Sequence, residues 1–108
     1  MPRLYLAGPM TGIPDYNYPQ FNAVAEQLRA KGFTVENPAE NQAPECGTWA
    51  GYMRIALRQV LACDVIAFLP GWEGSRGARL EHQVATELGL KICLAADLLN
   101  PSLLKDAL

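Results

Sequence analysis

The apolar run over residues 64–69 (DVIAFL) constrains the fold more than any other segment. Five consecutive apolar residues follow Asp64, and Pro70 and Gly71 end the run. The run is too short for a typical helix, and it lacks the alternation of a strand with one exposed face. It therefore predicts a strand that is buried on both faces, as in parallel sheets covered by helices.

Strand and helix patterns alternate along the rest of the chain. Short apolar runs predict three more strands, over residues 4–7, 33–36 and 90–95. Apolar residues at helical spacing predict helices over residues 18–31, 48–62 and 75–89. Thr48 and Ser75 have side chains suited to N-terminal caps, and Gly32 suits the end of the first helix. Residues 37–47 are expected to form a polar loop, and residues 97–108 either a short helix or irregular structure.

This order of elements predicts one α/β domain over residues 1–108, with three α/β/α layers around a four-stranded parallel sheet. Right-handed crossovers favour the strand order 2-1-3-4. In that order the direction in which successive strands are added to the sheet reverses between the first and third strands. Ligands of such sheets bind at this switch point, beyond the carboxyl ends of the strands. The loops that leave those two strands, residues 8–17 and 70–74, are therefore expected to form the site.

Composition narrows the classes of partner. The 108 residues carry a net charge of −2 and contain no basic tract, which argues against binding of duplex nucleic acid. No apolar run approaches the roughly 20 residues of a membrane span, and the N-terminal segment is too short for a signal peptide. Cys46, Cys63 and Cys93 form neither a disulfide framework nor a CxxC metal site. We therefore expect a cytoplasmic protein with no membrane partner, no metal ion and no cofactor.

Glu81 is the candidate catalytic residue because it occupies the centre of the apolar face of the third predicted helix. Six residues share that face: Gly77, Ala78, Glu81, Val84, Ala85 and Leu88. The opposite face carries Arg79, His82, Gln83, Thr86 and Glu87. An unpaired buried charge costs several kcal/mol. Two interpretations follow: a core pair with Arg54 or Arg58, or a carboxylate that faces a small-molecule pocket.

The first predicted loop begins Gly8-Pro9-Met10-Thr11-Gly12. Its glycines allow backbone amides to approach a ligand closely, and Thr11 adds a hydroxyl group. Its spacing is not that of a P-loop. Tyr5, in the strand before this loop, either belongs to the core or points into the site.

The second predicted loop leads into the helix that carries Glu81. It brings Ser75, Arg76 and the first amides of that helix to one place, which either binds a phosphate or is an ordinary capped helix start. Trp72 in the same loop either stacks on a base or packs against its neighbours or a second subunit.

Two motifs resemble the nucleoside 2-deoxyribosyltransferase superfamily, which includes the 2′-deoxynucleoside 5′-phosphate N-hydrolases. They are LYLAG over residues 4–8 and Ser75-x-Gly77-x-x-x-Glu81. The runs YLAGPMTG and PGWEGSRGARLE are most similar to small bacterial and phage proteins of the DUF4406 type. The resemblance covers residues 3–95. It implies a flavodoxin-like fold that is usually oligomeric and binds a nucleoside or nucleotide.

The resemblance also implies roles for individual residues. The nucleophilic glutamate of the superfamily falls on Glu81, and its active-site tyrosine falls on Tyr5. Its phosphate-binding serine falls on Ser75, which favours a 5′-phosphorylated ligand. The superfamily has a catalytic aspartate eight residues before the position of Asp64, where this chain has Ala56. An alanine cannot orient or protonate a leaving base.

Together these observations predict a nucleotide-binding protein that acts as an N-glycosidase or deoxyribosyltransferase on a (deoxy)nucleoside 5′-monophosphate. Glu81 and Tyr5 are the expected catalytic residues. The expected substrate contacts are Gly8, Met10, Thr11, Gly12, Trp72, Ser75, Arg76 and Gly77. The alternative is a nucleotide-binding module whose catalysis is impaired by Ala56. A purely structural domain is a third possibility. A homodimer or higher homo-oligomer is expected from the resemblance.

Overall fold

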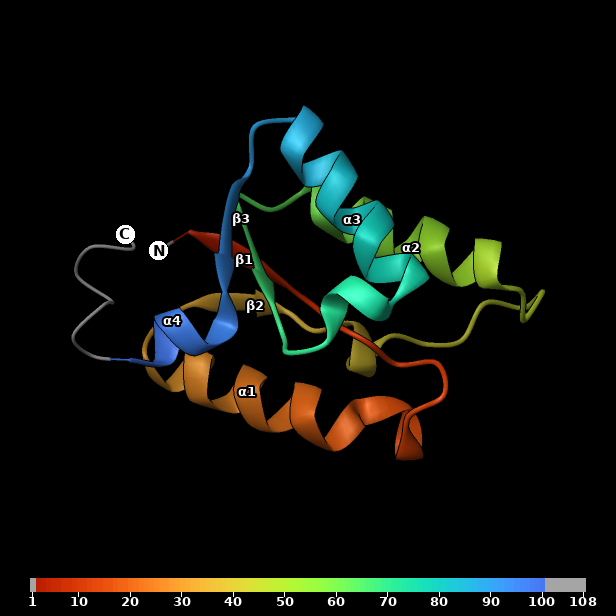
Figure 1. Ribbon diagram of the computed structural model, residues 1–108, viewed down its shortest axis with the longest axis horizontal. Helices are drawn as coiled ribbons and strands as arrows, with labels where there is room; N and C mark the ends of the chain where they lie inside the picture. The colour runs from red at the N-terminus through yellow and green to blue at the C-terminus, as the bar shows by residue number, and fades with distance from the viewer. Residues whose placement is uncertain (1, 101–108) are drawn as a thin grey trace.

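Four parallel strands form the central layer of the protein, in the predicted order 2-1-3-4 (Figure 1). The computed structural model describes residues 2–100. The strands are β1 (Arg3–Ala7), β2 (Thr34–Glu36), β3 (Val65–Phe68) and β4 (Lys91–Leu94). Because β1 pairs with both β2 and β3, the carboxyl end of β1 lies in the middle of the sheet's edge.

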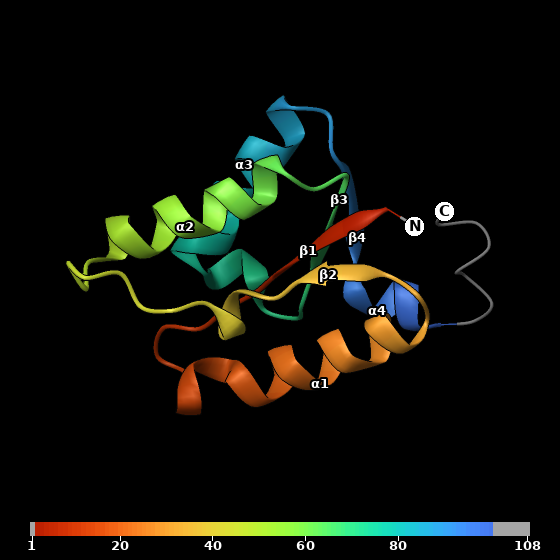
Figure 2. The same ribbon diagram turned by 180° about the vertical axis from the view of Figure 1, so that it is seen from behind.

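Helices cover both faces of the sheet, which confirms the expected three-layer, flavodoxin-like architecture (Figures 1 and 2). One face carries α1 (Tyr18–Ala30) and α4 (Ala95–Leu99). The other face carries α2 (Trp49–Leu61) and α3 (Arg76–Glu87). Short 3₁₀ helices lie in the loops: η1 (Pro14–Asn17), η2 (Pro38–Glu40) and η3 (Trp72–Gly74). Within residues 2–100, no helix combines the length and apolar character that crossing a membrane requires.

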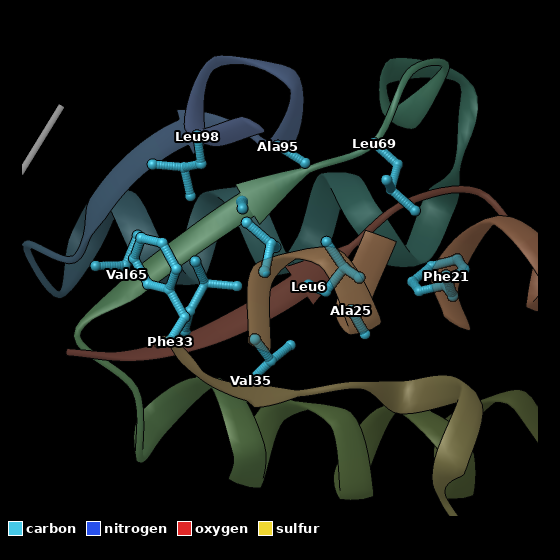
Figure 3. Close-up of a cluster of buried hydrophobic side chains, with 12 residues drawn as sticks. Leu6, Phe21, Ala25, Phe33, Val35, Val65, Leu69, Ala95 and Leu98 are labelled. Atoms are coloured by element: carbon cyan, nitrogen blue, oxygen red, sulfur yellow. The ribbon is translucent and has the colours of Figure 1, made fainter. Parts of the chain in front are cut away.

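The alternation of side chains along the strands divides the interior into two cores. Leu4 and Leu6 pack with α1 and α4, and Figure 3 shows this first core, which includes Phe21 of α1 and Leu98 of α4. Tyr5 and Ala7 point to the other face and pack with α2 and α3. The second core therefore contains a phenol hydroxyl group directly beneath the two helices.

The helix ends follow the sequence expectations. Thr48 Oγ1 accepts a hydrogen bond from the backbone N–H of Gly51 at 3.0 Å. Ser75 Oγ accepts one from the N–H of Ala78 at 3.2 Å, so both predicted caps are confirmed. Gly32 ends α1 with a positive φ of 99°, a conformation that glycine adopts without strain.

Three expectations about α3 and β4 were wrong in detail. Leu88 is 57% exposed because it lies just beyond the last residue of α3, where the helical face ends. His82, expected on the solvent side, packs against Phe68 with ring centroids 5.4 Å apart. β4 is shorter than the predicted strand because Ala95 already begins α4. α4 contains the start of the predicted 97–108 segment, and residues 101–108 lie outside the described range.

Gly8, at the exit of β1, packs closely against the residue that follows β3. A Cβ atom at position 8 would lie 2.8 Å from Cβ of Leu69. We expect Gly8→Ala to lower the free energy of unfolding by about 1–3 kcal/mol, because neither backbone can easily move aside. Gly74 has open space around it, so Gly74→Ala is the matched control and should change stability by less than about 0.5 kcal/mol. Urea unfolding measures both, and equal midpoints for the two variants would contradict the close approach.

Candidate functional site

A cavity of about 400 Å³ opens at the carboxyl end of β1. Its walls come from β1 and the loop after it, the start of α1, the loop after β2, α2, and the first turns of α3. A volume of this size suits a small organic ligand. The cavity lies beyond the end of the first strand, as expected. It extends toward β2, however, and residues 70–74 do not line it.

Glu81 and Tyr5 meet on the wall of this cavity. Glu81 of α3 is 5% exposed and Tyr5 of β1 is 1% exposed. The Tyr5 hydroxyl group donates a hydrogen bond to Glu81 Oε2 at 2.5 Å. Among the described residues, Glu81 Oε1 has no hydrogen-bond partner, whereas every fully buried side-chain oxygen has one. Oε1 is therefore not fully buried. Oε1 therefore faces the open cavity, while Tyr5 fixes the orientation of the carboxyl group.

Burial controls the protonation of both groups. It raises the pKa of Glu81 from 4.5 to about 7, and the hydrogen bond from Tyr5 offsets part of that rise. The pKa of Tyr5 lies well above its usual 10, first because of burial and second because of the nearby charge of Glu81. Glu81 is therefore partly protonated at neutral pH, and Tyr5 keeps its proton.

No described cation neutralises Glu81. Arg54 and Arg58 are exposed, and the ion pair found within residues 2–100 joins Arg29 to Glu40 at 2.8 Å. The interpretation of Glu81 as half of a core salt bridge is therefore wrong. Glu81 is also the one charged residue among the described residues that line the cavity.

Ala56 lies on the cavity wall, as the helical pattern predicts for that position. It is 7% exposed, belongs to the same core as Tyr5, and lines the cavity together with Glu81. A longer side chain at position 56 would therefore point toward the ligand space. Asp64 is remote from it: its carboxylate accepts a hydrogen bond from the N–H of Arg3 at the opposite end of β1.

The loop after β1 forms the outer part of the wall. Gly8, Met10 and Thr11 line the cavity, whereas Gly12 does not. Beyond them, three consecutive residues, 15–17, adopt left-handed backbone angles with φ between 53° and 62°. Aspartate and asparagine, at positions 15 and 17, tolerate this conformation better than most residues, whereas it costs about 1–2 kcal/mol at Tyr16. Tyr16, the middle one, is 62% exposed and borders the cavity.

The start of α3 separates the remaining predicted contacts into two groups. Ser75 and Gly77 line the cavity. Arg76 does not, because its guanidinium group lies over the ring of Trp49, 3.6 Å from the centroid. Trp72 is also outside the lining and stacks on His82 with ring centroids 4.7 Å apart. Of the three possibilities for Trp72, packing against its neighbours is the one that the structure shows.

Part of the wall was not anticipated. Asn41 and Gln42, from the loop after β2, and Trp49 and Tyr52, from α2, all border the cavity. Asn41 is held by a reciprocal pair of amide hydrogen bonds with Gln59, at 2.7 and 2.9 Å. The available signal was the strand order, since β2 neighbours β1 and its loop must emerge at the same edge of the sheet.

Residues 2–94 match the family model described as a domain of unknown function, DUF4406. The chain belongs to the DUF4406 family. No curated protein matches the sequence closely enough to serve as a relative. The matched range of the DUF4406 domain contains the whole cavity wall, from Tyr5 to Glu81.

The chemistry available to this DUF4406 domain centres on one oriented carboxyl group. Within residues 2–100, no three histidine, cysteine, aspartate or glutamate side chains gather closely enough to hold a metal ion. When ionised, Glu81 places a negative charge in a poorly solvated space, where charge stabilisation is stronger than in water. The site is therefore suited to stabilise or trap a cationic centre.

The buried charge of Glu81 should make folding of the DUF4406 domain depend on pH. Since the pKa of Glu81 is about 7 in the folded protein and 4.5 as a model value, the folded state binds more protons between these values. Stability should thus fall as the pH rises from about 4.5 to 7, by about 3 kcal/mol in all. Glu81→Gln keeps the shape and the acceptor for Tyr5 but removes the charge, so this variant should lack the decrease.

Urea unfolding of wild type and Glu81→Gln at pH 5 and pH 8 measures this dependence. Glu87→Gln is the matched control, because Glu87 is an exposed carboxylate on the same helix. The control should keep the wild-type dependence. Parallel profiles for wild type and Glu81→Gln would show that Glu81 is not desolvated in the folded protein.

Proposed function

We propose that this protein binds a nucleoside or nucleotide in the cavity and cleaves its N-glycosidic bond, passing the sugar either to water or to another base. The observation that carries the proposal is the carboxyl group of Glu81, buried without a cation and fixed by Tyr5 on the wall of a ligand-sized cavity. The resemblance to the nucleoside 2-deoxyribosyltransferase superfamily, which the DUF4406 match itself does not extend to, supports the same reaction class.

The proposed mechanism uses the two oxygens of Glu81 differently. Cleavage at C1′ of the sugar passes through an oxocarbenium-like transition state, which a nearby carboxylate stabilises or traps covalently. Oε1 faces the cavity and would meet C1′, while Tyr5 holds Oε2. Water or an acceptor base then takes the sugar from Glu81, which distinguishes a hydrolase from a transferase.

The start of α3 supports a 5′-monophosphate as the proposed ligand. The first N–H groups of a helix lack intrahelical acceptors and attract anions. Ser75 and Gly77 border the cavity there, and Arg76 places a positive charge close by, over Trp49. Gly8, Met10 and Thr11 also line the cavity and would border the sugar or base.

The alternative function is a nucleotide-binding module without turnover. Ala56 favours it, because the position that faces the cavity beside Glu81 lacks a proton donor. In either case we propose a cytoplasmic protein that forms a homodimer or higher homo-oligomer, the oligomer being what the superfamily resemblance implies. Exposed Tyr16 at the cavity rim is one candidate for contact with a second subunit, and sedimentation equilibrium would determine the oligomeric state.

Substitution of Glu81 separates the enzyme from the binding module. Glu81→Gln should lower the rate of base release by at least about 1,000-fold while the protein still binds nucleotide, because the cavity keeps its shape and loses the nucleophile. Chromatography of nucleoside monophosphates incubated with the protein measures released base, and calorimetry measures binding. Glu87→Gln is the control and should behave as wild type.

Each outcome of that experiment decides between the candidates. Binding with base release that depends on Glu81 supports the enzyme. Binding without release by any protein supports the module. Release that is equally fast in wild type and Glu81→Gln contradicts the role of Glu81, and the absence of binding contradicts both functions.

A further inference from the structure

The cavity contains a nucleophile but no evident acid for a leaving base. An ordinary purine or pyrimidine leaves C1′ with an extra electron pair, so a general acid must protonate it during cleavage. Among the described residues that line the cavity, Glu81 is the sole carboxylic acid, and none is histidine, lysine, arginine or cysteine. The hydroxyl groups of the wall belong to tyrosine, serine and threonine, which are weaker acids than a carboxyl or imidazolium group.

Glu81 cannot perform both tasks in one step. A carboxylate that attacks C1′ must be ionised, whereas a carboxylic acid that protonates the base must carry the proton. Tyr5 already directs its proton at Glu81 Oε2 and is enclosed in the core, so it is not aimed at a leaving base. Residue 56 lines the cavity at the position of the superfamily's catalytic aspartate, but as an alanine it offers only a methyl group.

The charge and surface of the cavity fit a cationic ring. Among the described residues, the one charged group of the lining is an anion. Aromatic side chains form much of the wall, among them Trp49, Tyr16 and Tyr52. Aromatic faces attract cations by about 0.5–2 kcal/mol. Trp49 already carries such a contact, with the guanidinium group of Arg76 over its ring.

We propose that the substrate class of this site is an N-ribosylpyridinium nucleotide, whose base is positively charged before cleavage. This inference rests on the proposed function and specifies its substrate. The C1′–N bond breaks and its electron pair neutralises the pyridinium nitrogen, so the base leaves as a neutral molecule without receiving a proton. Glu81 Oε1 forms a bond to C1′ or shields it. Water then attacks C1′, which breaks the C1′–Oε1 bond where one has formed and returns its electron pair to the Glu81 carboxylate. The sugar gains a hydroxyl group, and one proton is released to solvent.

Nicotinamide mononucleotide is the direct probe, compared with the monophosphates of adenosine, deoxyadenosine, cytidine and deoxycytidine. Incubation with the full chain at pH 8, followed by chromatography, measures released base. We expect nicotinamide release to be at least about 100-fold faster than release of the ordinary bases, because general acid catalysis contributes at least that factor. Glu81→Gln should abolish nicotinamide release, and Glu87→Gln should not.

The outcomes separate this inference from the proposed function. Comparable release of ordinary bases by wild type would overturn the substrate class and leave N-glycosidase activity standing. Release from no substrate, nicotinamide mononucleotide included, would overturn both the substrate class and the enzymatic function. Fast nicotinamide release that survives Glu81→Gln would overturn the assignment of the reaction to this cavity.

A gain-of-function variant tests the cause of the restriction. Ala56→Asp restores an acid on the cavity wall and should raise release of the ordinary bases by about 100-fold or more. Ala50→Asp is the matched control, because Ala50 is exposed on the same helix and does not line the cavity. Circular dichroism establishes that each variant is folded. If folded Ala56→Asp gains no activity on ordinary nucleotides, the missing acid is not what limits the substrate range.

Discussion

The hydrogen bond between Tyr5 and Glu81 is the interaction on which the site depends. It joins the central strand β1 to helix α3 across 76 residues of sequence and is buried on the side of the sheet covered by α2 and α3. A lone carboxyl group there is tolerated because one oxygen has a donor and the other meets an open cavity. Gly77 and Ala78, one turn before Glu81 on α3, line that cavity with it. Gly77 lies close to α2, where a Cβ atom would be 3.1 Å from Sδ of Met53.

The fold could be predicted from the sequence because local patterns and global architecture agree. Continuous apolar strands, capped helices and short connections leave few topologies, and β2-β1-β3-β4 is among them. The wrong predictions lie where a helix ends before its apolar pattern does, or where an aromatic neighbour packs against a polar position. Leu88 continues the apolar face of α3 by sequence, but the helix has already ended. His82 has the polar position of the pattern, yet Phe68 and Trp72 provide a partly buried place for its ring.

Only part of the candidate site could be predicted from the sequence in the same way. Glu81 and the start of the β1 loop were named because a buried acid and a glycine-rich turn stand out in the sequence. The pattern around Tyr5 left core and site open, and the family resemblance alone favoured the site. Asn41 and Trp49 were missed because their approach to the cavity depends on the path of the loop after β2, which no local pattern specifies. Trp72 could not be assigned to the ligand or to its neighbours for the opposite reason: its surroundings are set by residues on β3 and α3 that only the folded chain brings together.

Two costly features of different origin meet at the same cavity. Desolvation of Glu81 disfavours folding when the carboxyl group is ionised, and the left-handed backbone of residues 15–17 carries conformational strain. A domain selected for stability alone could relieve the first by glutamine at position 81 and much of the second by glycine at position 16. Neither feature supports the other, since one lies on α3 and the other precedes α1. Their shared location supports the binding or catalytic role that we propose for this cavity.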